Sequence, residues 1–174
     1  MAHQNFSEGK ILIPSDLCFF GACREEPSKT GLMIPYELID HTADIGLKVN
    51  GTTLFDLFEN AALGMFHIIG GKVKSQDSAV LEKSIEVKKT VDAFEELLVS
   101  WLSELLYIFN KEKIYFTNFE IASLNNNGII GEAKGFKIDS RQASLYTEIK
   151  AVTFHGLKIE EDVEGFHCNI IFDV

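Results

Sequence analysis

The chain has 174 residues, of which 46% are hydrophobic, so it is long and apolar enough for one folded domain with a sizeable core. It carries 26 acidic and 16 basic residues, for a net charge of −10. This charge repels phosphate backbones, so the chain is not expected to bind nucleic acid by itself, and any contact with RNA should be indirect or weak. The acidic surface suits a divalent cation or a basic protein partner.

Targeting signals are not evident in the sequence. The three cysteines (Cys18, Cys23 and Cys168) do not have the spacing of a zinc site, and their odd number is typical of a reducing compartment. The apolar stretch 17–23 is short, and no basic segment closely precedes it, so we expect neither a signal peptide nor a membrane span. A cytoplasmic location is the expectation, with the nucleus as the alternative.

The first part of the chain differs in pattern from the rest. Residues 1–33 include Pro14, Pro27 and the polar run "REEPSKTG", and they show no regular periodicity. We interpret them as an irregular N-terminal extension. Residues 34–174, where clear periodicities begin, are interpreted as the folded domain.

Two segments have the three- and four-residue apolar spacing of amphipathic helices, residues 52–69 and 92–110. Each begins with a residue that can cap a helix and a carboxylate three residues later that can return the hydrogen bond. The predicted pairs are Thr53 with Asp56, and Asp92 with Glu95. Gly70-Gly71 predicts the end of the first helix.

Strand patterns fill most of the remaining sequence. They cover residues 84–88, 113–124, 129–138, 144–159 and 165–174. Asn127-Gly128 predicts a tight hairpin turn, and the long segment 144–159 is expected to bend near His155-Gly156. Strands and helices do not alternate regularly. The pattern therefore predicts an α+β fold, with two amphipathic helices packed on a largely antiparallel or mixed sheet.

The segment "DHTAD", residues 40–44, supports two interpretations. Asp and Thr side chains often bond to nearby backbone groups, which favours an ordinary capped turn. Alternatively, Asp44 is an oxygen ligand of a hard cation. His41 would then suit a supporting hydrogen bond better than direct ligation, because such cations prefer oxygen. The segment alone leaves both interpretations open.

The residues that close the sequence also support two interpretations. Asp173 lies beside the terminal carboxylate of Val174, and two adjacent anions are costly unless water or a cation neutralises them. Chain ends are usually solvated, which favours a plain charged tail. However, apolar residues alternate as far as Phe172, and this pattern predicts a strand that would hold Asp173 in place. Together with Asp44, these groups could form a calcium or magnesium site.

Three motifs in this order resemble the archease family. They are "DHTADIG" (40–46) followed by a Thr-capped helix, "IKAVTFHGLKI" (149–159), and the closing "IIFDV" (170–174). The resemblance extends from about residue 36 to residue 174. It implies a fold of strand–helix–strand–strand modules and an accessory protein rather than an enzyme.

The resemblance also implies a partner and a site. Archease supports the RtcB-type RNA ligase of tRNA splicing, which joins cyclic-phosphate and 5′-hydroxyl RNA ends, and it promotes ligase guanylylation and multiple turnover. The implied ligands of a divalent cation, with calcium expected and magnesium or manganese as alternatives, are Asp44, Asp173 and the terminal carboxylate of Val174. The implied supporting residues are Asp40, His41 and His155. Gly156 departs from the family pattern, which often has Asp there, so a lower metal affinity or a different ligand set is expected if that position contributes to the site.

Two other functions remain open. One is a metal-independent protein-binding or chaperone-like module, for which the acidic surface would suffice. The other is a hydrolase in which Asp44 or Asp40 works with His41 or His155 as acid and base. The sequence shows neither a nucleophile motif nor an oxyanion motif beside these residues.

Overall fold

The computed structural model describes residues 34–40, 44–70, 80–138 and 146–174, and Met33–Val174 form one compact unit. The described residues contain two helices, α1 (Leu54–Gly70) and α2 (Phe94–Glu112). The strands are β1 (Tyr36–Asp40), β2 (Ile45–Gly51), β3 (Leu81–Lys88), β4 (Ile114–Asn125), β5 (Gly128–Lys137), β6 (Ala151–Thr153), β7 (Glu160–Asp162) and β8 (Gly165–Asp173).

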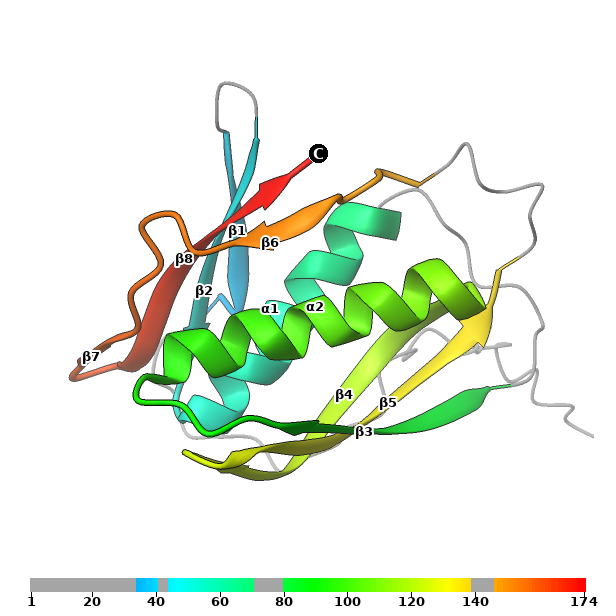
Figure 1. Cartoon of the computed structure of the whole chain (residues 1–174). Helices are drawn as coiled ribbons and strands as arrows, with labels where there is room; N and C mark the ends of the chain where they lie inside the picture. The colour runs from blue at the N-terminus through cyan, green and yellow to red at the C-terminus, as the bar shows by residue number, and fades with distance from the viewer. Residues whose placement is uncertain (1–33, 41–43, 71–79, 139–145) are drawn as a thin grey trace, which may run out of the picture. The chain divides into compact units, whose positions relative to one another are not determined.

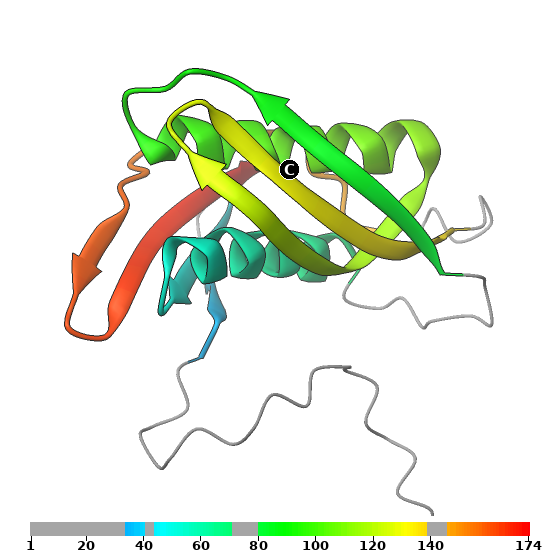
Figure 2. The ribbon, with the colours of Figure 1, turned by 90° about the horizontal axis from the view of Figure 1, so that it is seen from below.

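The strands form two sheets rather than the single sheet that the sequence predicts. Sheet A has the order β1-β2-β8-β6, with β7 paired to β8, and sheet B has the order β3-β5-β4. All pairings among the described strands are antiparallel. The two helices lie between the sheets, where α1 contacts β2 and β4 while α2 contacts β6 and all three strands of sheet B (Figure 1, Figure 2). This arrangement is an α+β fold, as predicted.

The predicted cap of α1 is confirmed. The Asp56 backbone N–H donates to the Thr53 hydroxyl at 3.1 Å, and the Thr53 N–H donates to the Asp56 carboxylate at 3.0 Å. These reciprocal bonds satisfy backbone donors that have no partner within the helix. The last residue of the helix is Gly70, where a Cβ would overlap the Tyr115 ring.

The predicted cap of α2 is wrong. The N-cap is Ala93 rather than Asp92, and it makes no side-chain capping bond. Glu95, the expected partner of Asp92, instead accepts a hydrogen bond at 2.9 Å from the backbone N–H of Ile159. The tertiary fold therefore uses this carboxylate to hold a distant segment, a role that local sequence pattern cannot show.

The core fills the space between the helices and the two sheets. Phe66 on α1 packs edge-on against Phe109, Tyr115 and Phe116, with ring centroids 5.5 to 5.9 Å apart. From sheet A, alternate residues of β2 and β8 enter the same core, among them Leu47, Val49, Ile170 and Phe172. Each such burial contributes roughly 1.5–3 kcal/mol of transfer free energy, which ties both strands to the helices.

The other strand predictions have mixed outcomes. The predicted hairpin is confirmed between β4 and β5, but its two turn residues are Asn126 and Asn127, because Gly128 already belongs to β5 and pairs with Asn125. The final strand is confirmed as β8. By contrast, the long strand predicted over 144–159 is wrong in extent, because its described part pairs only along β6. The bend predicted near His155-Gly156 is present, with Gly156 in the left-handed region at φ 65°. Strands β1 and β2 were not predicted.

Candidate functional site

The register of β2 against β8 brings Asp44 and Asp173 to the same end of sheet A. Ile45 pairs with Phe172 in this antiparallel ladder. Asp44 directly precedes Ile45 and Asp173 directly follows Phe172, so the same register places the two aspartates opposite each other. β2 and β8, which come from opposite ends of the domain sequence, lie side by side (Figure 1).

Both aspartates belong to the face of sheet A that points away from the helices. Along the ladder, the pairs on either side of Gly46–Ile171, which are Ile45–Phe172 and Leu47–Ile170, face the core, so Gly46 and Ile171 belong to the outer face. Alternation therefore puts Asp44 and Asp173 on the outer face as well. Asp44 is half-buried, and the Asp173 side chain is 52% exposed, so a cation or a partner protein can reach it.

Asp40 and His41 relate to this pair to different extents. Asp40 is the last residue of β1 and pairs with Ile45, so its backbone lies one strand away from the aspartate pair. The side chain of Asp40 and all of His41 lie outside the described residues. The supporting roles expected for them therefore stay predictions.

Val174 lies at the same end of the sheet, where Lys150 contacts it. The Lys150 ammonium nitrogen is 2.8 Å from the Val174 backbone oxygen and 3.9 Å from Asp173 Oδ1. The Lys150 backbone N–H also donates to the Asp173 carbonyl oxygen at 2.8 Å. The Val174 side chain packs partly buried against the core, so Val174 is positioned both by this packing and by the contact with Lys150.

His155 is not brought to the aspartate pair. Ala151 of β6 pairs with Asp173, while Thr153 pairs with Ile171, so β6 runs away from Asp173. His155 lies two residues further along, in an exposed turn beyond the end of β6 that is remote from Asp173. Gly156 belongs to the same turn. The absence of an Asp at that position therefore takes no ligand away from this end of the sheet.

The donor atoms that gather at this end are oxygens, which suit a hard divalent cation. The Lys150 ammonium already lies near two of these oxygens, the Val174 backbone oxygen and Asp173 Oδ1, so this end of the sheet accommodates a positive charge. Within the part of the chain that the structure describes, no group of three His, Cys, Asp or Glu side chains is placed to hold a metal. A cation site here would need Asp44, Asp173 and a further donor, and the predicted further donor is the Val174 carboxylate.

Sequence reasoning missed Lys150. This residue lies in the motif "IKAVTFHGLKI", but a lysine is not a metal ligand type at neutral pH, so it drew no attention. A signal was nevertheless present. Lys150 comes directly before the alternation that forms β6, and a positive charge at a strand start can pair with acidic groups on the neighbouring strand.

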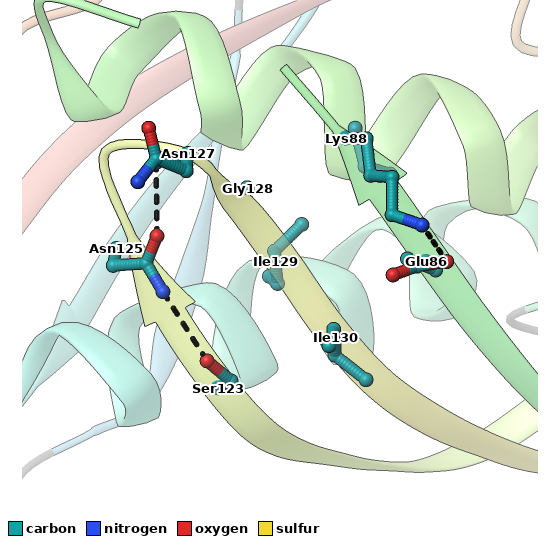
Figure 3. A pocket seen from close by; sticks show the side chains of 9 residues that line it. Glu86, Lys88, Ser123, Asn125, Asn127, Gly128, Ile129 and Ile130 are labelled. Atoms are coloured by element: carbon teal, nitrogen blue, oxygen red, sulfur yellow. Dashed lines mark hydrogen bonds and ion pairs between the residues drawn. The ribbon is translucent and has the colours of Figure 1, made fainter. Parts of the chain in front are cut away.

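Two further features do not offer a site for chemistry. Burial, with a smaller contribution from Glu95, raises the pKa of the Cys168 thiol to about 12, so this thiol stays protonated at neutral pH and is a poor nucleophile. A shallow hollow lies beside the β4–β5 turn, and its polar groups bond to one another (Figure 3). Asn125 bridges Ser123 and the Asn127 N–H, at 3.3 and 2.9 Å, and Lys88 pairs with Glu86 at 3.1 Å.

Comparison with known proteins identifies the family. The model of the Archease protein family (MTH1598/TM1083) matches residues 36–174, so this chain belongs to the archease family. Protein archease from Methanosarcina barkeri is 39% identical over 143 residues, covering 80% of this chain and 95% of the relative. Protein archease from Pyrococcus furiosus is 36% identical over 138 residues, covering 76% of this chain and 93% of the relative.

A solved structure supports the same assignment. The solution structure of Methanobacterium thermoautotrophicum protein 1598 matches with a TM-score of 0.61 and 32% sequence identity. The match covers 80% of this chain and 99% of that one. In the described part of the chain, neither helix has the length and apolar composition needed to cross a membrane.

Proposed function

We propose that this chain is an accessory factor that activates an RtcB-type RNA ligase in tRNA splicing, by promoting ligase guanylylation and multiple turnover. Membership of the archease family supports an accessory role. The observation that carries the proposal is the β2–β8 register, which unites Asp44 of the first family motif with Asp173 of the last. Two motifs so far apart in sequence would not need to meet if each were only a local turn or tail.

The proposed site is a divalent-cation site formed by Asp44, Asp173 and the carboxylate of Val174. Adjacent carboxylates repel each other, and a bound cation neutralises them and fixes their positions. Calcium fits such exposed oxygen donors, with magnesium or manganese as alternatives. Asp40 and His41 are proposed to support the ligands. A supporting role for His155 rests on the family resemblance alone.

The proposed docking surface is the outer face of sheet A around this site. This face points away from the helices, and its aspartates lie at the end of the sheet, where a partner protein can approach. With a cation bound, the acidic end would dock near the nucleotide- and metal-containing active site of the ligase. There it would hold the geometry for nucleotidyl transfer or deliver metal. Direct RNA contact is not required, in keeping with the net charge of −10.

The test measures ligase guanylylation and multiple-turnover RNA joining with wild type, Asp44→Asn and Asp173→Asn. Both variants keep the size of the side chain and remove one negative charge. We expect wild type to stimulate the ligase, and each variant to lose about 10- to 100-fold of that stimulation through lost metal affinity. Glu120→Gln is the matched control, because it removes one exposed carboxylate from sheet B, and it should stimulate like wild type.

Three outcomes would count against the proposal. If wild type leaves its cognate ligase unchanged, the proposed activity is wrong. Full stimulation by folded Asp44→Asn and Asp173→Asn would favour the metal-independent binding module. Turnover of a substrate without any ligase would favour the hydrolase, although the separation of His155 from Asp44 deprives that alternative of one acid–base pair.

A further inference from the structure

We propose that Lys150 is a built-in counter-cation of the acidic end of sheet A, and that it competes with a divalent cation for the same oxygens. Lys150 would thereby set how tightly the metal binds. The inference rests on the proposed cation site, and it adds a regulating residue that contributes no ligand atom. Its basis is the contact of the ammonium with Val174 and Asp173.

The position of Lys150 is fixed by the backbone rather than by the side chain alone. Its N–H donates to the Asp173 carbonyl oxygen at 2.8 Å, and the next residue, Ala151, pairs with Asp173 in the ladder. The ammonium is therefore tethered within one side-chain length of the acidic end. A tethered charge has a high effective concentration at its target, whereas a free ion must be drawn from solution.

The contact has opposite consequences in the two states of the site. Without metal, the positive charge of Lys150 offsets the repulsion between Asp173 and the neighbouring carboxylates. When a divalent cation approaches the same oxygens, the ammonium must move away, because like charges repel. The side chains of Lys150 and Asp173 are 60% and 52% exposed, so solvent screens both effects and keeps them modest.

Removal of the charge at residue 150 should therefore have two results of opposite sign. Lys150→Gln is expected to bind calcium and magnesium roughly two- to fivefold more tightly than wild type, the range expected for one exposed, partly screened charge. In the absence of metal, the same variant is expected to unfold at a lower temperature than wild type. Added calcium should remove this difference in unfolding temperature. A purely structural lysine would lower the stability without tightening metal binding.

The experiment is isothermal titration of the full chain with calcium chloride and, separately, with magnesium chloride. The variants are Lys150→Gln, Lys150→Arg and Lys158→Gln, each checked for folding by circular dichroism. Lys150→Arg retains the charge and should bind metal within about twofold of wild type. Lys158→Gln is the control on the same segment, because its ammonium pairs with Glu160 at 2.7 Å instead, and it should match wild type.

Salt provides a second readout. Since the competition is between exposed charges, the advantage of Lys150→Gln over wild type should shrink as sodium chloride rises from low to about 0.5 M. An advantage that is independent of salt would overturn the counter-cation role, because a steric effect of the side chain would not be screened.

The outcomes separate this inference from the proposed function. If wild type binds calcium, Asp173→Asn loses binding and Lys150→Gln binds no more tightly than wild type, the role of Lys150 is wrong and the cation site stands. If wild type binds neither calcium nor magnesium, both the cation site and the role of Lys150 are wrong. Metal binding that survives both Asp44→Asn and Asp173→Asn would also overturn both, since the metal would then bind elsewhere.

Discussion

At the scale of single residues, Tyr115 shows how a partly buried polar group is accommodated at the end of a helix. Its hydroxyl donates to the Phe66 backbone oxygen at 2.8 Å, and its ring occupies the space that the absent Cβ of Gly70 leaves. Burial, followed by the neighbouring Tyr36 and Tyr146, raises the pKa of Tyr115 from 10.0 to about 12. The folded protein therefore favours the neutral phenol.

The sign of this shift gives a pH prediction. A raised folded-state pKa contributes stability that is fully present below the unfolded value of 10.0 and is lost as pH rises through about 12. At pH 8, Tyr115→Phe should lower the free energy of unfolding by about 1 kcal/mol, through the lost hydrogen bond. At pH 11 the difference between wild type and variant should shrink towards zero, because ionisation then favours the unfolded wild type.

Urea unfolding of both proteins at the two pH values measures this difference. A Tyr115→Phe difference that is the same at pH 8 and pH 11 would mean that the burial of this phenol does not affect its ionisation.

At the scale of elements, the two helices begin in different ways. The first turn of α1 carries the reciprocal bonds between Thr53 and Asp56, while Ala93 at the start of α2 makes no capping bond through its side chain. We therefore expect Thr53→Ala to lower the free energy of unfolding by about 1 kcal/mol. Asp92→Ala should cost less than about 0.5 kcal/mol, as for an ordinary surface substitution.

Chemical unfolding of Thr53→Ala and Asp92→Ala under the same conditions measures the two losses of unfolding free energy. Equal losses would show that Asp92 caps α2 in solution. The comparison also tests a general point. A capping pattern in a sequence forms a cap only if its carboxylate is not bound elsewhere, and in this protein the Glu95 carboxylate accepts a hydrogen bond from the Ile159 backbone N–H.

At the scale of the whole domain, the helices join both sheets into one core. Trp101, the only tryptophan of the chain, is fully buried on α2, and a Cβ on Gly131 of β5 would lie 2.9 Å from its ring. Phe172 of β8 is buried in the same core cluster. Because both sheets depend on the same helices for burial, neither sheet has a core of its own.

We therefore expect residues 34–174 to unfold as one cooperative unit. Trp101 fluorescence, which reports on α2 and sheet B, should change at the same urea concentration as far-UV circular dichroism, which reports on all elements. Two separated transitions would show that sheet A and sheet B unfold independently, and would contradict the shared core.

The sequence predicted those features that depend on local pattern. The cap and apolar stripe of α1, the β4–β5 hairpin and the alternation of β8 are all encoded within short segments. Strands β1 and β2 were missed because their pattern is short and is interrupted by the polar segment 40–44. The prediction of a long strand at 144–159 was wrong because part of that segment makes isolated backbone hydrogen bonds rather than a continuous ladder. For example, the Thr147 N–H donates to the Ile69 carbonyl oxygen.

The candidate site could be predicted only in part. The polar groups of Asp44 and Asp173 stood out as residue types, but their meeting depends on the register of strands far apart in sequence. Their oxygen chemistry suggested a shared cation and the family resemblance implied the same pairing, but no periodicity shows which strands pair. The position of Lys150 before an alternating segment was a weak signal, but its partners are fixed by the pairing of β6 with β8, which the sequence does not show.

The pairing of β2 with β8 also has a consequence for synthesis on the ribosome. The ladder between β2 and β8 cannot form at Ile45 until its partner Phe172 has been synthesised, which is 127 residues later (172 − 45 = 127). At roughly 5–20 residues per second, translation leaves β2 without its neighbour for about 6–25 seconds. During that time the β1–β2 hairpin presents an open edge that other chains can join. We therefore expect this edge to be open to association with other chains until the acidic end of the sheet has been made.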